Sequence, residues 1–326
     1  MRARPCTPKP PSTAPTPFAT GWRCSAERPH TAPMSTSIPV IDVSALASDD
    51  AAARRAVAAQ VGAACRDIGF FAITGHGVPA TTVADTFAAS AAFFAQPMAD
   101  KQALAYASLS HNRGYVGTGV EALDEHRGAD QKEAFNLIWT DEATRPPNAW
   151  PALPDWRGTV QAYFDATLAA ARALHRAFAL DLGLAEDFFD DKIDRPLATL
   201  RLLHYPVSAV AQAGREDDGI GAGAHTDYGN VTLLATDGVS GLQVQGRERD
   251  TWIDVPPLPG AFVCNIGDCL MRWTNDVYLS TPHRVLRPAR ERYSIALFLD
   301  PNPDALVSAL PSCVPPGQAP RHAPIT

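Results

Sequence analysis

Three residues in the second half of the chain have the types and the spacing of a metal site. His225 and Asp227 stand two positions apart in a His-Thr-Asp triplet, and His283 follows 56 residues later. Residues i and i+2 of a strand project to one face, so the first two can bind a single ion from a strand edge. In a β-barrel, a later strand could bring His283 next to His225 and Asp227. Two imidazoles and one carboxylate leave three positions of the ion open, which suits non-haem Fe(II) that activates O₂.

A candidate anion site begins nine residues after His283. Arg292 and Ser294 flank Tyr293, so in a strand the guanidinium and the hydroxyl share one face while Tyr293 points away. A planar guanidinium beside a hydroxyl suits a carboxylate. The sequence therefore predicts a carboxylate clamp close to a metal.

The sequence around these residues predicts the strands and helices that hold them in place. From residue 198 onward, short β-rich runs alternate with Gly, Pro, Asn and Asp turns, which is typical of an antiparallel barrel or jelly roll. The first half is mainly helical, with apolar residues at helical spacing in 48–69, 81–96 and 158–182. The early strand at 38–42 can pair into the later sheet. We therefore expect a fold that is mainly β with flanking helices around a jelly-roll core.

Composition divides the chain into four parts. Residues 1–33 hold five basic residues, one acidic residue and eight of the 29 prolines, so we expect them to be disordered. The same composition could belong to a transit peptide, but its proline density opposes the amphipathic helix that such signals use. A start codon assigned too far upstream, with translation beginning at Met34, is the other interpretation. Residues 34–155 then form an N-terminal helical module, 156–304 the jelly-roll region with the metal site, and 305–326 a Pro-rich tail.

Charge and cysteine content exclude several classes of protein. The chain has 326 residues and carries 28 basic against 35 acidic residues, and the resulting net charge of −7 argues against a nucleic-acid or anionic-membrane partner. No apolar run has the length of a membrane-spanning helix. The six cysteines show no disulfide or zinc spacing, which favours reduced thiols and a cytoplasmic location. A small molecule is the expected partner, and the oligomeric state is left open.

Several motifs, taken together, resemble a known family. HTDYG, NIGD, STPHRV and RYSI are similar to motifs of the isopenicillin N synthase-like branch of the Fe(II)/2-oxoglutarate-dependent oxygenases. IPVIDVSAL and DIGFFAITGHGVP resemble the N-terminal module of that branch. The resemblance spans residues 38–303.

The resemblance implies a double-stranded β-helix core, a metal site and a co-substrate site. It assigns Fe(II) to His225, Asp227 and His283. It assigns the distal carboxylate of 2-oxoglutarate to Arg292 and Ser294, with Tyr205 adding a hydroxyl. The implied reaction consumes O₂ and 2-oxoglutarate, releases succinate and CO₂, and is helped by ascorbate. In NIGD, we expect Asn265 and Gly267 to shape a turn.

The Gly-rich, charged segment 111–137 is the expected wall of a substrate pocket, because this region closes over the metal in relatives. A solvated loop is the alternative interpretation. Phe298 shares a strand face with Ser294 and could add an apolar wall. The candidate substrate residues are Arg113, Tyr115, Glu133, Phe135 and Phe298.

The sequence supports an oxygenase that hydroxylates, desaturates or cyclises a small organic substrate, and leaves that substrate unnamed. Within the family, formation of ethylene and succinate from 2-oxoglutarate and 2-oxoglutarate-independent oxidation are alternatives. In other classes, the same three ligands suit a Zn(II) hydrolase or a non-catalytic metal-binding barrel.

Overall fold

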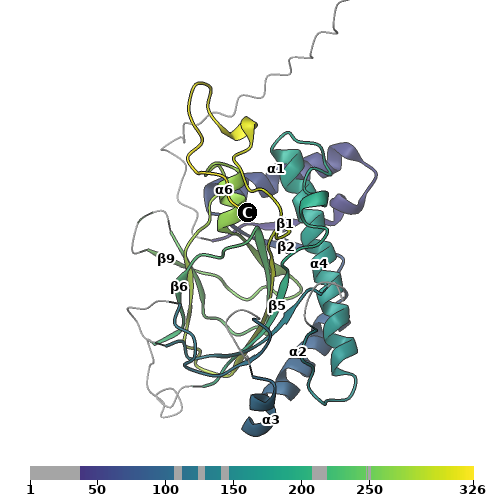
Figure 1. The fold of residues 1–326 in the computed structure, drawn as a ribbon, viewed down its shortest axis with the longest axis vertical. Helices are drawn as coiled ribbons and strands as arrows, with labels where there is room; N and C mark the ends of the chain where they lie inside the picture. The colour runs from purple at the N-terminus through teal and green to yellow at the C-terminus, as the bar shows by residue number, and fades with distance from the viewer. Residues whose placement is uncertain are drawn as a thin grey trace, which may run out of the picture. The chain divides into compact units, whose positions relative to one another are not determined.

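Two β-sheets face each other in this computed structural model (Figure 1). Helices cover the face of the larger sheet that points away from the smaller sheet. The structure describes residues 37–105, 112–123, 129–140, 147–207, 219–246, 248 and 251–326, all within one compact unit of residues 33–326. The expectations for residues 1–33 and for a start at Met34 lie outside the described residues. The prediction of a mainly β fold with flanking helices is confirmed.

The larger sheet draws its eight strands from both halves of the chain. In spatial order they are β1 (Val40–Asp42), β2 (Phe70–Thr74), β10 (Phe262–Ile266), β7 (Val231–Thr236), β12 (Arg292–Leu299), β5 (Thr199–Tyr205), β4 (Glu133–Ile138) and β3 (Gly114–Val116). The early strand β1 pairs parallel with β2, and β2 pairs antiparallel with β10. Segment 34–155 therefore completes the same sheet as the later strands.

The smaller sheet has four antiparallel strands. In spatial order they are β6 (Ile220–His225), β11 (His283–Leu286), β8 (Leu242–Gln245) and β9 (Trp252–Asp254). The helices are α1 (Ala51–Asp67), α2 (Ala80–Phe94), α3 (Met98–Ala103), α4 (Trp156–Asp181) and α6 (Asp268–Trp273), with short 3₁₀ turns at Ser44–Ala47, Asp190–Lys192 and Pro311–Cys313.

The expected helices form close to their predicted limits, because local signals fix their ends. The Asp50 carboxylate accepts hydrogen bonds from the backbone N–H groups of Ala52 and Ala53 and so caps α1. Gly69 ends that helix at φ +71°, where a Cβ would lie 2.1 Å from the Leu279 carbonyl oxygen. Only glycine fits this position without displacing the neighbouring chain.

Successive side chains of the larger sheet enter two different cores. On β12, Ile295 and Leu297 pack among the helices, whereas Ala296 and Phe298 pack in the space between the two sheets. The same alternation holds on β5, since Leu202 belongs to the helix-side core and Tyr205 to the core between the sheets. We call these the outer and inner faces of the larger sheet.

The Pro-rich tail packs against the rest of the fold. The Leu310 N–H donates to the Trp273 carbonyl at the end of α6, Val307 pairs with Ile325, and Cys313 is buried. Among the described residues, no helix is both long and apolar enough to cross a membrane.

A buried histidine on α4 couples stability to pH. The Nδ1–H group of His175 donates to the Ala171 carbonyl at 2.8 Å, and Asn230 Nδ2 donates to its Nε2 at 3.0 Å. Burial lowers the pKa of His175 to about 4 in the folded protein.

We expect this histidine to destabilise the metal-free protein at acidic pH. The unfolded chain takes up a proton near pH 6.5 that the folded chain does not bind until about pH 4, so stability is lost as pH falls through that window. The loss is about 3 kcal/mol at its limit. Urea unfolding at pH 7.5 and pH 5 measures it, and His175→Gln should flatten the slope. An equal slope in both proteins would contradict this assignment.

Candidate functional site

The three predicted metal ligands meet where β6 and β11 lie side by side. These strands pair antiparallel with His225 directly opposite His283, and Asp227 follows β6 by two residues. Each histidine Nε2 lies 3.8 Å from Asp227 Oδ1, and the three candidate ligand atoms lie within 4.8 Å of one another. One ion can therefore contact all three.

Backbone carbonyls fix which nitrogen each histidine presents. Nδ1 of His225 donates to the Gly223 carbonyl at 2.7 Å, and Nδ1 of His283 donates to the Thr281 carbonyl at 3.3 Å. A carbonyl only accepts, so each Nδ1 carries the proton and each Nε2 keeps a free electron pair. Burial and the nearby His283 lower the pKa of His225 to about 4, which leaves this ring neutral and able to bind a metal at pH 7.

The Asp227 carboxylate is oriented in the same way. Its Oδ2 accepts hydrogen bonds from Thr232 Oγ1 at 2.5 Å and Asn265 Nδ2 at 2.6 Å, so Oδ1 is left facing the histidines. Burial acts to raise the pKa of this carboxyl. The two histidines and the two hydrogen bonds outweigh burial and hold the pKa below its ordinary value. The group is therefore an ionised carboxylate with one oxygen available.

The interpretation of Asn265 as a turn residue is wrong. Asn265 lies within β10 and donates to Asp227, whereas Gly267 lies where the chain runs close to the segment after Asp227. A Cβ on Gly267 would lie 2.3 Å from the Gly229 carbonyl oxygen. The signal in the sequence was a lone amide in the apolar run FVCNI, since a buried polar side chain in a strand needs a partner.

The residues of the predicted clamp lie together on the inner face, at the start of β12. Arg292 pairs across the strands with Tyr205, and its guanidinium lies 4.9 Å from the centroid of the Tyr205 ring. Arg292 donates to Ser294 Oγ at 3.2 Å and to the Val239 carbonyl at 3.3 Å. The residue is 1% exposed, and none of the described carboxylates pairs with it. A buried guanidinium without an acid is costly, so this place suits an anion.

Three of the predicted substrate residues point away from the metal ligands. Tyr115, Glu133 and Phe135 lie on the outer face, where Tyr115 Oη donates to Glu133 Oε2 at 2.6 Å. Phe135 packs against Phe93 of α2 with ring centroids 4.5 Å apart. The reason is strand alternation, which places Ala134 and Asn136 of β4 on the inner face instead. The prediction that these three residues line the substrate pocket is therefore wrong, because they pack between the larger sheet and the helices.

The other two substrate candidates differ from these. Phe298 lies on the inner face and pairs across the strands with Thr232, which bonds Asp227. Arg113 is half-buried and directly precedes β3, and its role in a pocket stays a prediction.

A group of polar residues on the inner face was not predicted from the sequence. Asn136 of β4 pairs across the strands with Arg201 of β5. Arg201 and Lys132 both form ion pairs with Glu121, and Lys132 also contacts Asp130. Among the described residues, the buried atoms Asn136 Oδ1 and Arg201 Nε have no hydrogen-bond partner. Strand alternation predicts that Asn136 and Ala134 share one face of β4. The sequence alone does not indicate whether that face points toward the space between the sheets or toward the helices.

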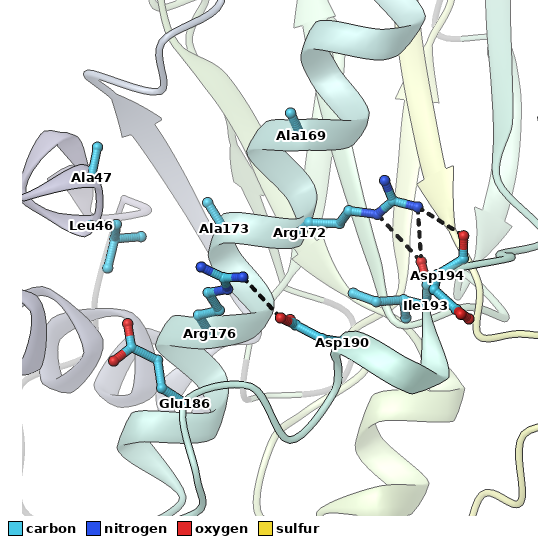
Figure 2. Close-up of a pocket in the computed structure, with 10 residues that line it drawn as sticks. All are labelled: Leu46, Ala47, Ala169, Arg172, Ala173, Arg176, Glu186, Asp190, Ile193 and Asp194. Carbon is cyan, nitrogen blue, oxygen red and sulfur yellow. Dashed lines mark hydrogen bonds and ion pairs between the residues drawn. The ribbon is translucent and has the colours of Figure 1, made fainter.

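A separate pocket of about 570 Å³ lies on α4 and the neighbouring turns (Figure 2). It contains none of the residues of the metal triad or the clamp, and its arginines have partners within it. Arg176 Nη2 bonds Asp190 at 2.8 Å, and Arg172 donates to the Ile193 carbonyl. The lining residues are Leu46, Ala47, Ala169, Arg172, Ala173, Arg176, Glu186, Asp190, Ile193 and Asp194.

Comparisons with known proteins identify the family. Residues 38–153 match the family described as the N-terminal region of non-haem dioxygenase in morphine synthesis, and residues 198–301 match the 2OG-Fe(II) oxygenase superfamily. The 2-oxoglutarate-Fe(II) type oxidoreductase hxnY of Emericella nidulans is 39% identical, over 89% of this chain and 87% of the relative.

Solved structures extend the likeness to the fold. The structure of Neurospora crassa T7H in complex with alpha-KG matches with a TM-score of 0.81 and 32% identity, over 88% of this chain and 92% of that one. JOX2 in complex with 2OG, Fe and JA matches with a TM-score of 0.76 and 31% identity, over 89% and 82%. This chain therefore belongs to the 2OG-Fe(II) oxygenase superfamily and is a 2-oxoglutarate-dependent dioxygenase.

Proposed function

We propose that His225, Asp227 and His283 hold Fe(II), and that Arg292 with Ser294 and Tyr205 binds the distal carboxylate of 2-oxoglutarate. The observation that carries the proposal is the buried guanidinium of Arg292, which has no described acid partner and faces the same inner space as the triad.

A count of charges supports this arrangement. Fe(II) with ionised Asp227 carries one positive charge, 2-oxoglutarate brings two negative charges, and Arg292 adds one positive charge. The assembled site is neutral, which a buried place tolerates far better than a net charge.

Each protein group then has a defined task. When bound, Fe(II) with 2-oxoglutarate supplies O₂ activation and oxidative decarboxylation to succinate and CO₂. The Gly223 and Thr281 carbonyls hold the protons of His225 and His283 on Nδ1, so both rings keep their orientation. Arg292 binds the far end of the co-substrate, and the surrounding apolar residues of the inner core exclude water.

We further propose that the substrate carries an N–H group beside a C=O group. The unpartnered Asn136 Oδ1 accepts a hydrogen bond and the unpartnered Arg201 Nε–H donates one, so an amide-like edge satisfies both. Phe298 supplies apolar contact on the same face. In support, Neurospora crassa T7H, 31% identical in both cases, has been solved with thymine and with 5-formyluracil, rings that present such edges.

The clamp assignment predicts that Arg292→Gln raises KM for 2-oxoglutarate. Loss of a charged hydrogen-bonding partner should raise it by roughly 10- to 100-fold. Succinate is measured after incubation with Fe(II), ascorbate, O₂ and 2-oxoglutarate, and headspace ethylene is measured in the same vials. Arg176→Gln, on α4, is the control. Absence of succinate from the parent protein under every condition would contradict the co-substrate assignment, and ethylene would identify fragmentation of 2-oxoglutarate.

The metal assignment predicts graded losses of metal affinity. Asp227→Ala should abolish binding of Mn(II), an inert substitute for Fe(II), because a ligand is lost. Asn265→Ala should weaken binding by roughly 10- to 100-fold, because the carboxylate loses its orientation. Calorimetric titration measures both, and Asn302→Ala, at another buried asparagine, is the matched control. Unchanged affinity in Asp227→Ala would rule out this metal centre.

The substrate assignment predicts a role for the Nε–H group of Arg201. Arg201→Lys keeps a positive charge for Glu121 but removes that donor, so KM for an amide-bearing substrate should rise by roughly 10-fold. Substrate-stimulated succinate release, with thymine and its N-methylated analogues as probes, tests the idea. The KM for 2-oxoglutarate should stay constant. Equal stimulation by both kinds of probe would refute recognition of the N–H edge.

A further inference from the structure

A chain of hydrogen-bonded polar side chains lies on the outer face of the larger sheet, behind the clamp. Lys101 Nζ donates to Glu133 Oε2 at 2.8 Å. Glu133 Oε1 accepts from His204 Nδ1 at 2.7 Å, and His204 Nε2 donates to Glu291 Oε1 at 2.8 Å. We call these four residues the outer-face network. It connects α3, β4 and β5 to the segment that precedes β12.

The network holds the His204 ring in one orientation. Both ring nitrogens face carboxylate oxygens, and ionised carboxylates only accept, so a ring with two N–H groups satisfies both contacts. The ring also stacks on Tyr293 of β12, with centroids 4.7 Å apart and planes 13° apart. Lys101, Glu133 and His204 are buried, and removal of one partner from a buried charged chain leaves the others unpaired.

Each of two network residues directly precedes a clamp residue. His204 precedes Tyr205 on β5, and Glu291 precedes Arg292. Arg292 pairs across the strands with Tyr205, and Tyr293 pairs with His204. The contact between His204 and Glu291 therefore bridges the two strands on the outer face at the level where the clamp forms on the inner face.

Arg292 needs this support because it is the first residue of β12. Strand ends open more readily than strand centres. Its own described contacts are a carbonyl at 3.3 Å, a hydroxyl at 3.2 Å and an aromatic ring, all of them neutral. The polar tethers at the other face of this end include the His204–Glu291 contact and the Tyr293 N–H bond to Asp237 Oδ2 at 2.7 Å. The Asp237 N–H also donates to the Tyr293 carbonyl at 3.3 Å, and the Tyr293 side chain bonds Glu291.

We propose that His204 and Glu291 are positioning residues for 2-oxoglutarate. They hold β5 and the start of β12 in the register that places the Arg292 guanidinium over Tyr205 and beside Ser294. This inference rests on the proposed role of the clamp. It states that the contact between His204 and Glu291 on the outer face increases the affinity of the clamp for 2-oxoglutarate.

The test is calorimetric titration of 2-oxoglutarate into the full-length protein loaded with Mn(II), which permits binding without turnover. Glu291→Ala should raise Kd for 2-oxoglutarate about 3- to 10-fold, and His204→Gln should raise it at least as much. Glu291→Gln keeps an acceptor oxygen for His204, so it should recover part of the affinity. Affinity for Mn(II) should stay constant, because the network contacts no metal ligand.

Glu291 is the informative position because its side chain is 56% exposed, so its removal is compatible with folding. Asp304→Ala is the matched control, since it removes an exposed carboxylate from the ion pair with Arg195. In the succinate assay, Glu291→Ala should raise KM for 2-oxoglutarate and leave kcat unchanged at saturation. If His204→Gln does not fold, Glu291→Ala decides alone.

The outcomes separate this inference from the proposed function. If the parent protein itself does not bind 2-oxoglutarate, the clamp assignment fails. If the parent binds but Glu291→Ala binds equally tightly, only the positioning role is overturned. A parallel loss of Mn(II) affinity, or an equal effect of Asp304→Ala, also overturns that role, because it indicates general loosening of the fold.

Discussion

The fold depends on one constraint, which is that the central strands of the larger sheet contribute side chains to two cores at once. Successive side chains point to opposite faces, so Leu200 and Leu202 of β5 pack against the helices, whereas Leu203 and Tyr205 lie between the sheets. A one-residue shift of register would exchange these sets and bury the guanidinium of Arg292 among the helices. Chemistry on the inner face is therefore tied to packing on the outer face.

The two faces also differ in the pairing of their polar groups near the clamp residues. In the outer-face network, each polar side chain has a partner within the network, and only Glu291 is exposed. The inner face instead keeps Arg292 without a described acid and leaves polar atoms of Asn136 and Arg201 unpaired. Satisfied charges serve the fold, whereas unsatisfied ones mark the places that a ligand completes.

The residues that the sequence predicted well are those whose relations are local or lie in recognisable motifs. Arg292 and Ser294 share a face because they are two residues apart in one strand, and the helix limits follow from Asp50 and Gly69. Tyr115, Glu133 and Phe135 were misplaced because periodicity shows that faces alternate but not which face is inner. Asn265 was misinterpreted for another reason, since its bond to Asp227 depends on the pairing of β10 with β7, strands far apart in sequence.

The unsatisfied inner face also has a thermodynamic consequence. Burial of Arg292 without a described acid lowers the stability of the empty protein. Under the proposed clamp assignment, binding of 2-oxoglutarate at this residue would remove that penalty. Ligand that binds only the folded state adds stability in proportion to the logarithm of its concentration relative to Kd. The helix-side core, built around α4 and the outer face, does not depend on the ligand and keeps the sheet folded meanwhile. The chain can therefore keep a buried guanidinium and unpaired polar atoms on the inner face, because a separate apolar core packs against the outer face of the same strands.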